Sequence, residues 1–272
     1  IQGSITGNQF DANAVLSALD ASKKARAESA AKEPPPVTPG DESAGLEGRF
    51  TVSVKQLHYA RANLDNMEAV ITFAKNGYRV DPLRIQPYGG TLTGVVASAP
   101  ITGTQATALG MELLIDRVDA RMLEDLLAEE PRGLTGALSG SVALQMPLLE
   151  GVSPINGANG TVTFTGEKGS FGKLGIATKI VTVLRTTEIT RLRIPSLKDE
   201  GLAYDKCEGE FVFTNGVMTL KTMKVESPSY IIQVGGTLDF PNNMTNLEVH
   251  VNILETVLGA ADLIPGGKEV TK

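Results

Sequence analysis

Residues 246–253, Asn-Leu-Glu-Val-His-Val-Asn-Ile, alternate strictly between polar and apolar side chains. Successive side chains of a β-strand point to opposite faces, so this stretch predicts a strand with one buried and one solvated face. The same alternation occurs in residues 50–54, Phe-Thr-Val-Ser-Val, and largely in residues 67–73, Met-Glu-Ala-Val-Ile-Thr-Phe. Half-buried strands of this kind are typical of antiparallel sheets.

Turn signals separate the alternating stretches. Asn76-Gly77 and Asn215-Gly216 predict tight hairpins, because Asn-Gly tolerates the positive φ that such turns need. Tyr88-Gly89-Gly90 predicts a further turn, and Pro82 indicates an edge position or a bulge. Additional strands are expected at 91–98, 111–116, 134–145, 157–167, 211–225 and 230–240. The expected fold is therefore mainly β with a few helices (α+β), built as an antiparallel meander.

Helical patterns occur at four places, and we expect these helices to pack on the sheet or cap it. Residues 11–31 are Ala-rich, with Asp11 as the expected N-cap. Residues 119–128 place Met122, Leu123, Leu126 and Leu127 on one face. The other two helices are predicted at 173–187, where the apolar stripe is broad, and at 254–264.

The chain divides into four parts by composition. Residues 1–7 resemble the end of a preceding strand with a Gly at each turn, and we expect the chain to be a fragment of a longer protein. Residues 8–47 combine the first helix with a Pro-rich linker. Residues 48–150 form a first β unit with a short helix, and residues 151–272 form a second β unit with the helix at 173–187 and a C-terminal helix.

The two β units contain similar motifs in the same order, which predicts a repeated strand–turn–strand unit. The first unit has Leu57-His58-Tyr59, then Phe73 to Gly77, then Gly89-Gly90-Thr91-Leu92. The second has Leu202-Ala203-Tyr204, then Phe213 to Gly216, then Gly235-Gly236-Thr237-Leu238.

Composition excludes several classes of protein. The chain has 272 residues, of which 42% are hydrophobic, so it can bury a core and is not disordered throughout. Its net charge of −6 argues against a nucleic-acid partner. Two His and one Cys leave little for a metal site or a disulfide framework. Asp116, Asp119, Glu124 and Asp125 are close in sequence, but helix-surface or capping roles suit them better than catalysis, so we expect no enzyme and no cofactor.

The candidate site is an apolar stripe carried by the alternating strands. It consists of Ala69, Ile71, Phe73, Ile85, Leu92, Val162, Phe164, Phe211, Phe213, Met218, Leu220, Leu238, Leu247, Val249 and Val251. Two interpretations stay open. The stripe is either a core closed by the helices at 119–128 and 173–187, or the concave face of a cupped sheet that stays open to lipid acyl chains.

Residues 57–94 resemble the C-terminal region of AsmA-like proteins of the Gram-negative envelope. The matching pieces are Asn66 and Ala69, Asn76-Gly77, Pro82-Leu83 and Tyr88-Gly89-Gly90-Thr91-Leu92-Thr93-Gly94. Leu134-Thr135-Gly136, Gly201 to Tyr204, Phe213 to Gly216, Gly235 to Asp239 and Ile264 to Gly267 follow in the order of the family, so the similarity extends over roughly residues 48–267.

The resemblance implies a curved, groove-shaped β structure in the periplasm, attached to the inner membrane by a helix outside this chain. It also implies a non-enzymatic role: shielding or conducting phospholipid or another lipid between the inner and outer membranes. One alternative is a scaffold that supports outer-membrane protein assembly and binds envelope assembly proteins. A second alternative is an enzyme acting on envelope polymers.

Overall fold

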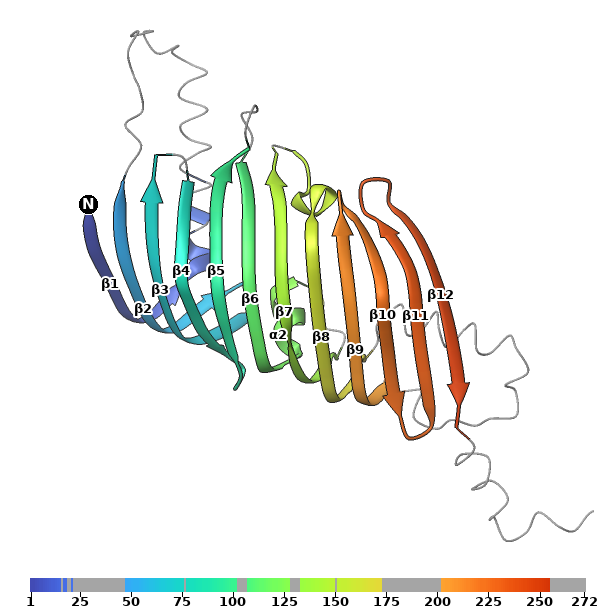
Figure 1. Ribbon diagram of the computed structural model, residues 1–272. Helices are drawn as coiled ribbons and strands as arrows, with labels where there is room; N and C mark the ends of the chain where they lie inside the picture. The colour runs from blue at the N-terminus through green and yellow to red at the C-terminus, as the bar shows by residue number, and fades with distance from the viewer. Residues whose placement is uncertain are drawn as a thin grey trace, which may run out of the picture.

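The computed structural model describes residues 1–15, 17, 18, 21, 47–75, 77–101, 107–127, 133–149, 151–172 and 202–254. Its strands form one open, 12-stranded sheet in which neighbouring strands follow the order of the chain (Figure 1). The mainly β character predicted from the alternating pattern is confirmed. The strands are β1 Gln2–Asp11, β2 Gly48–Tyr59, β3 Ala62–Ala74, β4 Gly77–Pro87, β5 Thr91–Pro100, β6 Thr107–Asp119, β7 Thr135–Leu148, β8 Asn159–Ser170, β9 Ala203–Thr214, β10 Val217–Ser227, β11 Tyr230–Asp239 and β12 Met244–Ile253.

The first strand pair departs from the predicted antiparallel meander. β1 runs parallel to β2, with Gly3 beside Phe50 and Ile5 beside Val52, whereas every other neighbouring pair is antiparallel. A parallel pair needs a long connection, and residues 12–47 provide one. β1 continues to Asp11, past the boundary expected at residue 8, and Gly3 and Gly7 lie within the strand rather than at turns.

The Asn-Gly hairpins are placed as predicted. β3 and β4 are joined at the pair Ala74–Gly77, and β9 and β10 at the pair Thr214–Val217. Asn215 and Gly216 have φ of 48° and 79°, as the two central residues of a type I′ turn require.

The predicted repeat agrees with the structure only at these hairpins. Gly89-Gly90 lies in the turn between β4 and β5, but Gly235-Gly236 lies inside β11, beside Glu248 and Leu247 of β12. Leu57-His58-Tyr59 lies at the end of β2, whereas Tyr204 lies near the start of β9. The dipeptide Gly-Gly fits both a turn and a strand interior, so it does not identify equivalent positions.

Bulges bend the strands. Asn66 in β3, Arg117 in β6 and Lys168 in β8 have φ of 48°, 51° and 49°, and each lies where its strand has an extra residue relative to a neighbour. Pro82 lies in a comparable bulge of β4, in agreement with the prediction from sequence. At their lower ends, as viewed in Figure 1, β2 and β3 turn and pass behind β4 and β5.

The described helices lie on the side toward which the strands bend (Figure 1). Asp11 caps the first one as predicted, because its Oδ1 accepts the N–H groups of Asn13 at 2.9 Å and Ala14 at 3.2 Å. Helix α2, Arg121–Leu127, corresponds to the predicted helix at 119–128. A short 3-10 helix, η1 Pro154–Gly157, precedes β8. The predicted helix at 173–187 lies outside the described residues, as does the one at 254–264 apart from Leu254.

Two apolar clusters stabilise the sheet. The first lies on β9–β11 and at the chain just before β9, and its buried members are Leu202, Tyr204, Cys207, Leu220, Val225, Tyr230, Ile232 and Val234. The second lies on β2 and β3, with Val52, Val54 and Ala69 buried. The core is therefore spread along one face of the sheet.

Candidate functional site: the apolar inner face

Strand register joins the apolar side chains into rows that run across the sheet. Directly paired residues of neighbouring strands share a face, so a row can be followed from pair to pair. One row crosses every strand: Ile5, Val52, Ala69, Leu83, Gly94, Leu113, Val142, Val162, Phe211, Leu220, Gly236 and Leu247. It contains only apolar residues and glycine. We call the face that carries this row the inner face.

A second row of the inner face is nearly as uniform. It crosses β2 to β12 through Phe50, Ile71, Val80, Val96, Met111, Leu144, Gly160, Phe213, Met218, Leu238 and Thr245. Aromatic rings of neighbouring rows meet on the inner face: Phe50 and Phe73 lie edge to face with ring centroids 6.0 Å apart, and the Phe164 and Phe211 rings lie 5.3 Å apart. Neither row contains a charged residue.

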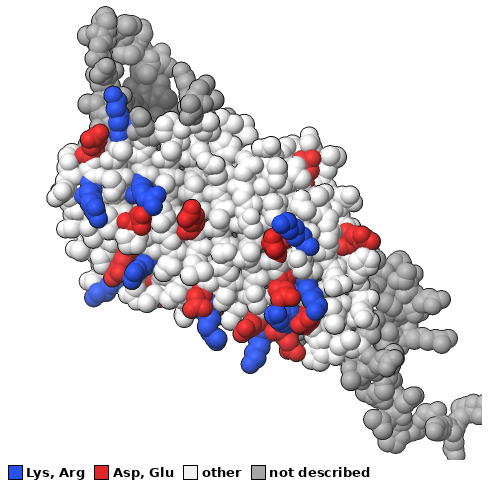
Figure 2. Space-filling model, viewed as in Figure 1, with Lys and Arg blue, Asp and Glu red and all other residues white. Residues whose placement is uncertain are grey.

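The outer face has the opposite character. One row of the outer face passes through Leu114, the residue that follows Leu113 in β6. This row includes Glu68, Arg84, Thr93, Ser141 and Thr163. Figure 2, which views the sheet from the side opposite the helices, shows acidic and basic side chains intermingled on this face. The sheet therefore separates an uncharged surface from a charged one.

Register places every residue of the predicted apolar stripe on the inner face. Ala69, Val162, Phe211, Leu220 and Leu247 belong to the first row, and the rest lie in parallel rows. Sequence reasoning missed the contributions of β6 and β7, among them Met111, Leu113 and Leu144. Leu114, which is 59% exposed on the outer face, interrupts the alternation in β6 and hides the pattern there.

Burial along the inner face differs between β10–β11 and the middle strands. Leu220 and Ile232, in β10 and β11, are 7% and 1% exposed, whereas Leu83, Leu113 and Val142 in β4, β6 and β7 are only partly buried. Helix α2, the first of the two helices predicted to close the core, lies at the lower rim of the sheet and contacts β3 (Figure 1). The second, at 173–187, lies outside the described residues.

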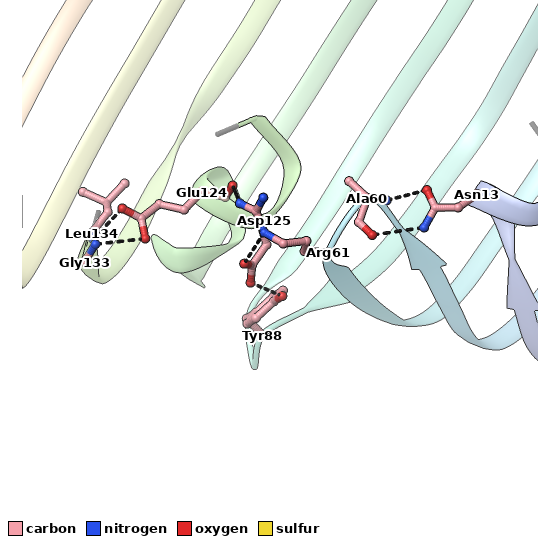
Figure 3. A network of polar contacts seen from close by, with 8 residues as sticks. All are labelled: Asn13, Ala60, Arg61, Tyr88, Glu124, Asp125, Gly133 and Leu134. Atoms are coloured by element: carbon pink, nitrogen blue, oxygen red, sulfur yellow. Dashed lines mark hydrogen bonds and ion pairs between the residues drawn. The ribbon is translucent and has the colours of Figure 1, made fainter. Parts of the chain in front are cut away.

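A polar network holds α2 to the rim (Figure 3). Arg61, in the turn between β2 and β3, donates from its backbone N–H to the Asp125 carbonyl at 3.1 Å and from Nη2 to the Glu124 carbonyl at 2.7 Å. These bonds satisfy carbonyls at the C-terminal end of a helix, which lack intrahelical partners. Its Nε lies 3.7 Å from the Asp125 carboxylate. The network thus joins β2 and β3 to an element that follows β6.

Three of the acidic residues near α2, Asp119, Glu124 and Asp125, have structural partners. Buried Glu124 accepts the N–H groups of Gly133 at 3.2 Å and Leu134 at 2.8 Å. Asp125 accepts the Tyr88 hydroxyl at 2.6 Å, and burial together with this bond raises the pKa of Tyr88. Asp119 receives Arg121 Nη2 at 2.7 Å. Burial alone raises the pKa of Asp119, but the bonds and charge of Arg121 outweigh it and lower the pKa.

The remaining groups with reactive chemistry are dispersed. His58 Nδ1 lies 3.0 Å from Asn63 Oδ1, and His250 Nε2 lies 3.1 Å from Glu248 Oε1. Cys207 is buried, and this burial raises the pKa of its thiol to about 12. Within the described residues, no three His, Cys, Asp or Glu side chains are arranged to hold a metal ion.

Comparisons with known proteins assign no family. No protein-family model matches the chain, and neither a curated protein nor a solved structure matches it. Among the described helices, none has the length and apolar character needed to cross a membrane.

Proposed function

We propose that the inner face binds lipid acyl chains and that the chain is a non-enzymatic part of an envelope protein similar to the AsmA-like family. In this proposal it works in the periplasm of a Gram-negative cell, attached to the inner membrane through a segment outside this chain, and conducts or shields lipid between the two membranes. The observation that supports it best is the uncharged row that runs without interruption from Ile5 to Leu247.

The dimensions of the inner face suit an acyl chain. A chain that fills one leaflet reaches about half of the ~30 Å hydrocarbon core, or about 15 Å, which is the width of about three strands at ~4.8 Å spacing. A 12-stranded sheet therefore provides room for several chains side by side. Each methylene removed from water contributes about 0.8 kcal/mol, and one chain alone gives only reversible binding. Reversible binding is what movement along a surface requires.

The partial burial of the middle strands also supports this proposal. In the two rows, the side chains of β4 to β8 are all only partly buried, whereas Leu220 in β10 is buried; the fully buried Pro87 and Val118 lie outside these rows. Apolar surface that remains accessible to solvent gains free energy when an acyl chain covers it. The middle of the sheet is therefore the expected place for lipid, and the headgroup would stay outside the uncharged rows, because burying an unpaired charge is costly.

Consecutive residues of β6 provide a matched test. Leu113 lies in the row across the inner face, and Leu114 is 59% exposed on the outer face of the same strand. We expect Leu113→Glu to reduce the phospholipid that copurifies with the protein from a Gram-negative host at least severalfold, because the carboxylate would meet the acyl chains. Leu114→Glu should leave it unchanged. The measurement is quantitative lipid mass spectrometry on solvent extracts of each variant.

Photo-crosslinking keeps the test valid if Leu113→Glu does not fold. A benzoylphenylalanine at position 113 should crosslink to phospholipid in cells, and the same group at position 114 should not. Equal lipid content in the two glutamate variants, or equal crosslinking at the two positions, contradicts the proposal.

A scaffold for outer-membrane protein assembly is the second candidate, and β1 favours it, because among the described residues this strand pairs with β2 alone. All residues of β1 are exposed, and Ile1 and Ile5 are 72% and 50% exposed. The backbone groups on the far side of an edge strand can pair with a strand of another protein. We expect Ile5→Lys to abolish capture of an envelope protein if this candidate is correct, because a charged side chain on an edge strand opposes pairing with another strand. Site-specific crosslinking from position 5 provides the readout.

A further inference from the structure

The outer face carries a polar hollow that the proposed lipid function does not use. It has a volume of about 790 Å³ and lies over β1 to β4 and the turn between β4 and β5. Gln56, Asp65 and Gln86 line it, and their neighbours Leu64 and Pro87 are buried on the other side of the sheet. Consecutive residues of β1, β2 and β3 line the hollow, so the regular alternation is interrupted here, at the level of the bulge at Asn66, and the buried Leu64 and Pro87 point to the opposite side of the sheet.

Carboxamide groups dominate the lining. Gln9 Nε2 donates to Gln56 Oε1 at 3.2 Å, and Asn66 Nδ2 donates to Gln86 Oε1 at 2.7 Å. A carboxamide carries two N–H donors and an oxygen with two lone pairs. Each pair therefore holds its groups in position and still presents donors and acceptors to a ligand, and Asn8 adds a fifth carboxamide.

One glycine, Gly89, opens the hollow to a ligand. Gly89 has φ of +82°, and a Cβ built there meets no atom within 4 Å, so the space above it is free. The next residue, Gly90, is buried, and a Cβ at this position would clash with the backbone of Arg117 and Val118. A ligand can therefore approach the main chain closely at this turn.

A second hollow of about 530 Å³ continues from the first. The two share Gly89, Gly90 and Thr91, and the second is lined further by Tyr88, Asp116 and Arg117. Charges of both signs occur in both: Lys55 with Asp65 in the first, and Asp116 with Arg117 in the second. The combined site is elongated and has no excess of either charge.

We propose that this site binds an uncharged oligosaccharide of at least two sugar units. Sugar hydroxyls donate and accept hydrogen bonds at once, as carboxamides do, which makes the two complementary. An anionic ligand such as a phosphate would need a cluster of basic groups, which this lining does not provide. An apolar ligand would leave the carboxamides without water or another partner, which is unfavourable. The volume of the first hollow alone lies within the range of ordinary ligand sites.

Titration with two defined oligosaccharides tests this proposal. We expect maltohexaose or chitotetraose, added to the whole chain, to shift amide NMR signals of residues 55–56, 65–66 and 86–91 with a saturable dependence on concentration. The double variant Gln56→Ala/Gln86→Ala should weaken that binding by about tenfold or more, since it removes two hydrogen-bonding groups. Both side chains are exposed, so the fold should tolerate the change.

Gln233→Ala is the matched control. Gln233 is an exposed outer-face residue of β11, far along the sheet from the hollow, and its loss should leave oligosaccharide binding unchanged. The absence of saturable shifts with both sugars overturns the proposal, as does equal binding by the double variant or equal weakening by the control. Copurified lipid should be unaffected in the double variant, so this result and the test of the inner face are independent.

Discussion

At the scale of single residues, position on one or the other face decides how much a side chain stabilises the protein. Ile231 and Ile232 are consecutive in β11 and identical in type. Ile232 is 1% exposed and belongs to the cluster on β9–β11, whereas Ile231 faces outward beside Glu226. The chemistry of the two side chains is the same, so any difference in their contributions comes from packing.

This pair leads to a direct stability prediction. Ile232→Ala should lower the free energy of unfolding by about 2–5 kcal/mol, because it removes buried methyl groups and leaves a cavity. Ile231→Ala should lower it by about 1 kcal/mol or less, because water already reaches that side chain. Urea denaturation followed by circular dichroism measures both. Equal losses in the two variants would show that the inner face is not the buried one at β11.

Residue identity alone predicted many of these positions but not all. Leu247, Val249 and Val251 were predicted because polar residues separate them. Leu113 was missed because Leu114 follows it, and two neighbouring leucines carry no information about which one points inward. The pairing of Leu113 with Val142 settles the question, and that pairing joins distant parts of the chain.

At the scale of elements, the Arg61 side chain is one of the main contacts that attach α2 to the rim. Arg61 bonds the carbonyls of Glu124 and Asp125 and lies near the Asp125 carboxylate, while Tyr88 donates to that carboxylate from a second turn. α2 has only seven residues, and helices of this length are not stable without tertiary contacts. The contacts of Arg61 therefore stabilise the helix as well as its position.

We expect Arg61→Ala to loosen α2 without unfolding the sheet. The amides of residues 121–127 should exchange with solvent at least tenfold faster than in the parent protein, because about 1.4 kcal/mol of lost stabilisation corresponds to a factor of ten. Amides of β10 to β12 should be unaffected, and hydrogen exchange with mass spectrometry reads both regions at once. Arg49→Ala, an exposed arginine on β2, is the control. Unchanged exchange in α2 would mean that Arg61 does not hold the helix.

The bulges show what local sequence can predict about an element. Pro82 indicated a bulge because proline lacks the N–H that a strand interior needs. Arg117 and Lys168 adopt the same left-handed conformation as Asn66, yet neither residue type favours it. Their conformation is imposed by the register of the neighbouring strands, which no short stretch of sequence contains.

At the scale of the whole molecule, the part of the chain that the structure describes contains two buried clusters with no residue in common. One involves Val52, Val54 and Ala69, and the other lies on β9–β11. Each strand pairs only with its immediate neighbours, so packing at one end reaches the other through many intervening strands. Proteins built in this way can open regionally, with a separate free energy for each region.

We therefore expect a destabilising substitution in one of the two clusters to leave the other end of the sheet unaffected. Ile232→Ala should speed amide exchange in β9 to β12 and leave protection in β2 to β4 within about twofold of the parent protein. Val54→Ala, in the other cluster, should produce the reverse pattern. Hydrogen exchange on both variants tests the expectation. If either change accelerates exchange equally along all the strands, the sheet unfolds as one cooperative unit.

By itself the sequence determined most of the strands, the hairpins at Asn-Gly, the helix at 119–128 and the apolar side of the alternating strands. These are local properties: a period of two, a turn that accepts positive φ and a helical stripe each depend on a few neighbouring residues. Only the tertiary structure decided that β1 lies parallel to β2, that all the strands join in one continuous sheet, and that bulges bend its lower rim. These features depend on which distant segments pair and in what register, and that choice is made by the free energy of the whole sheet rather than by any single stretch of it.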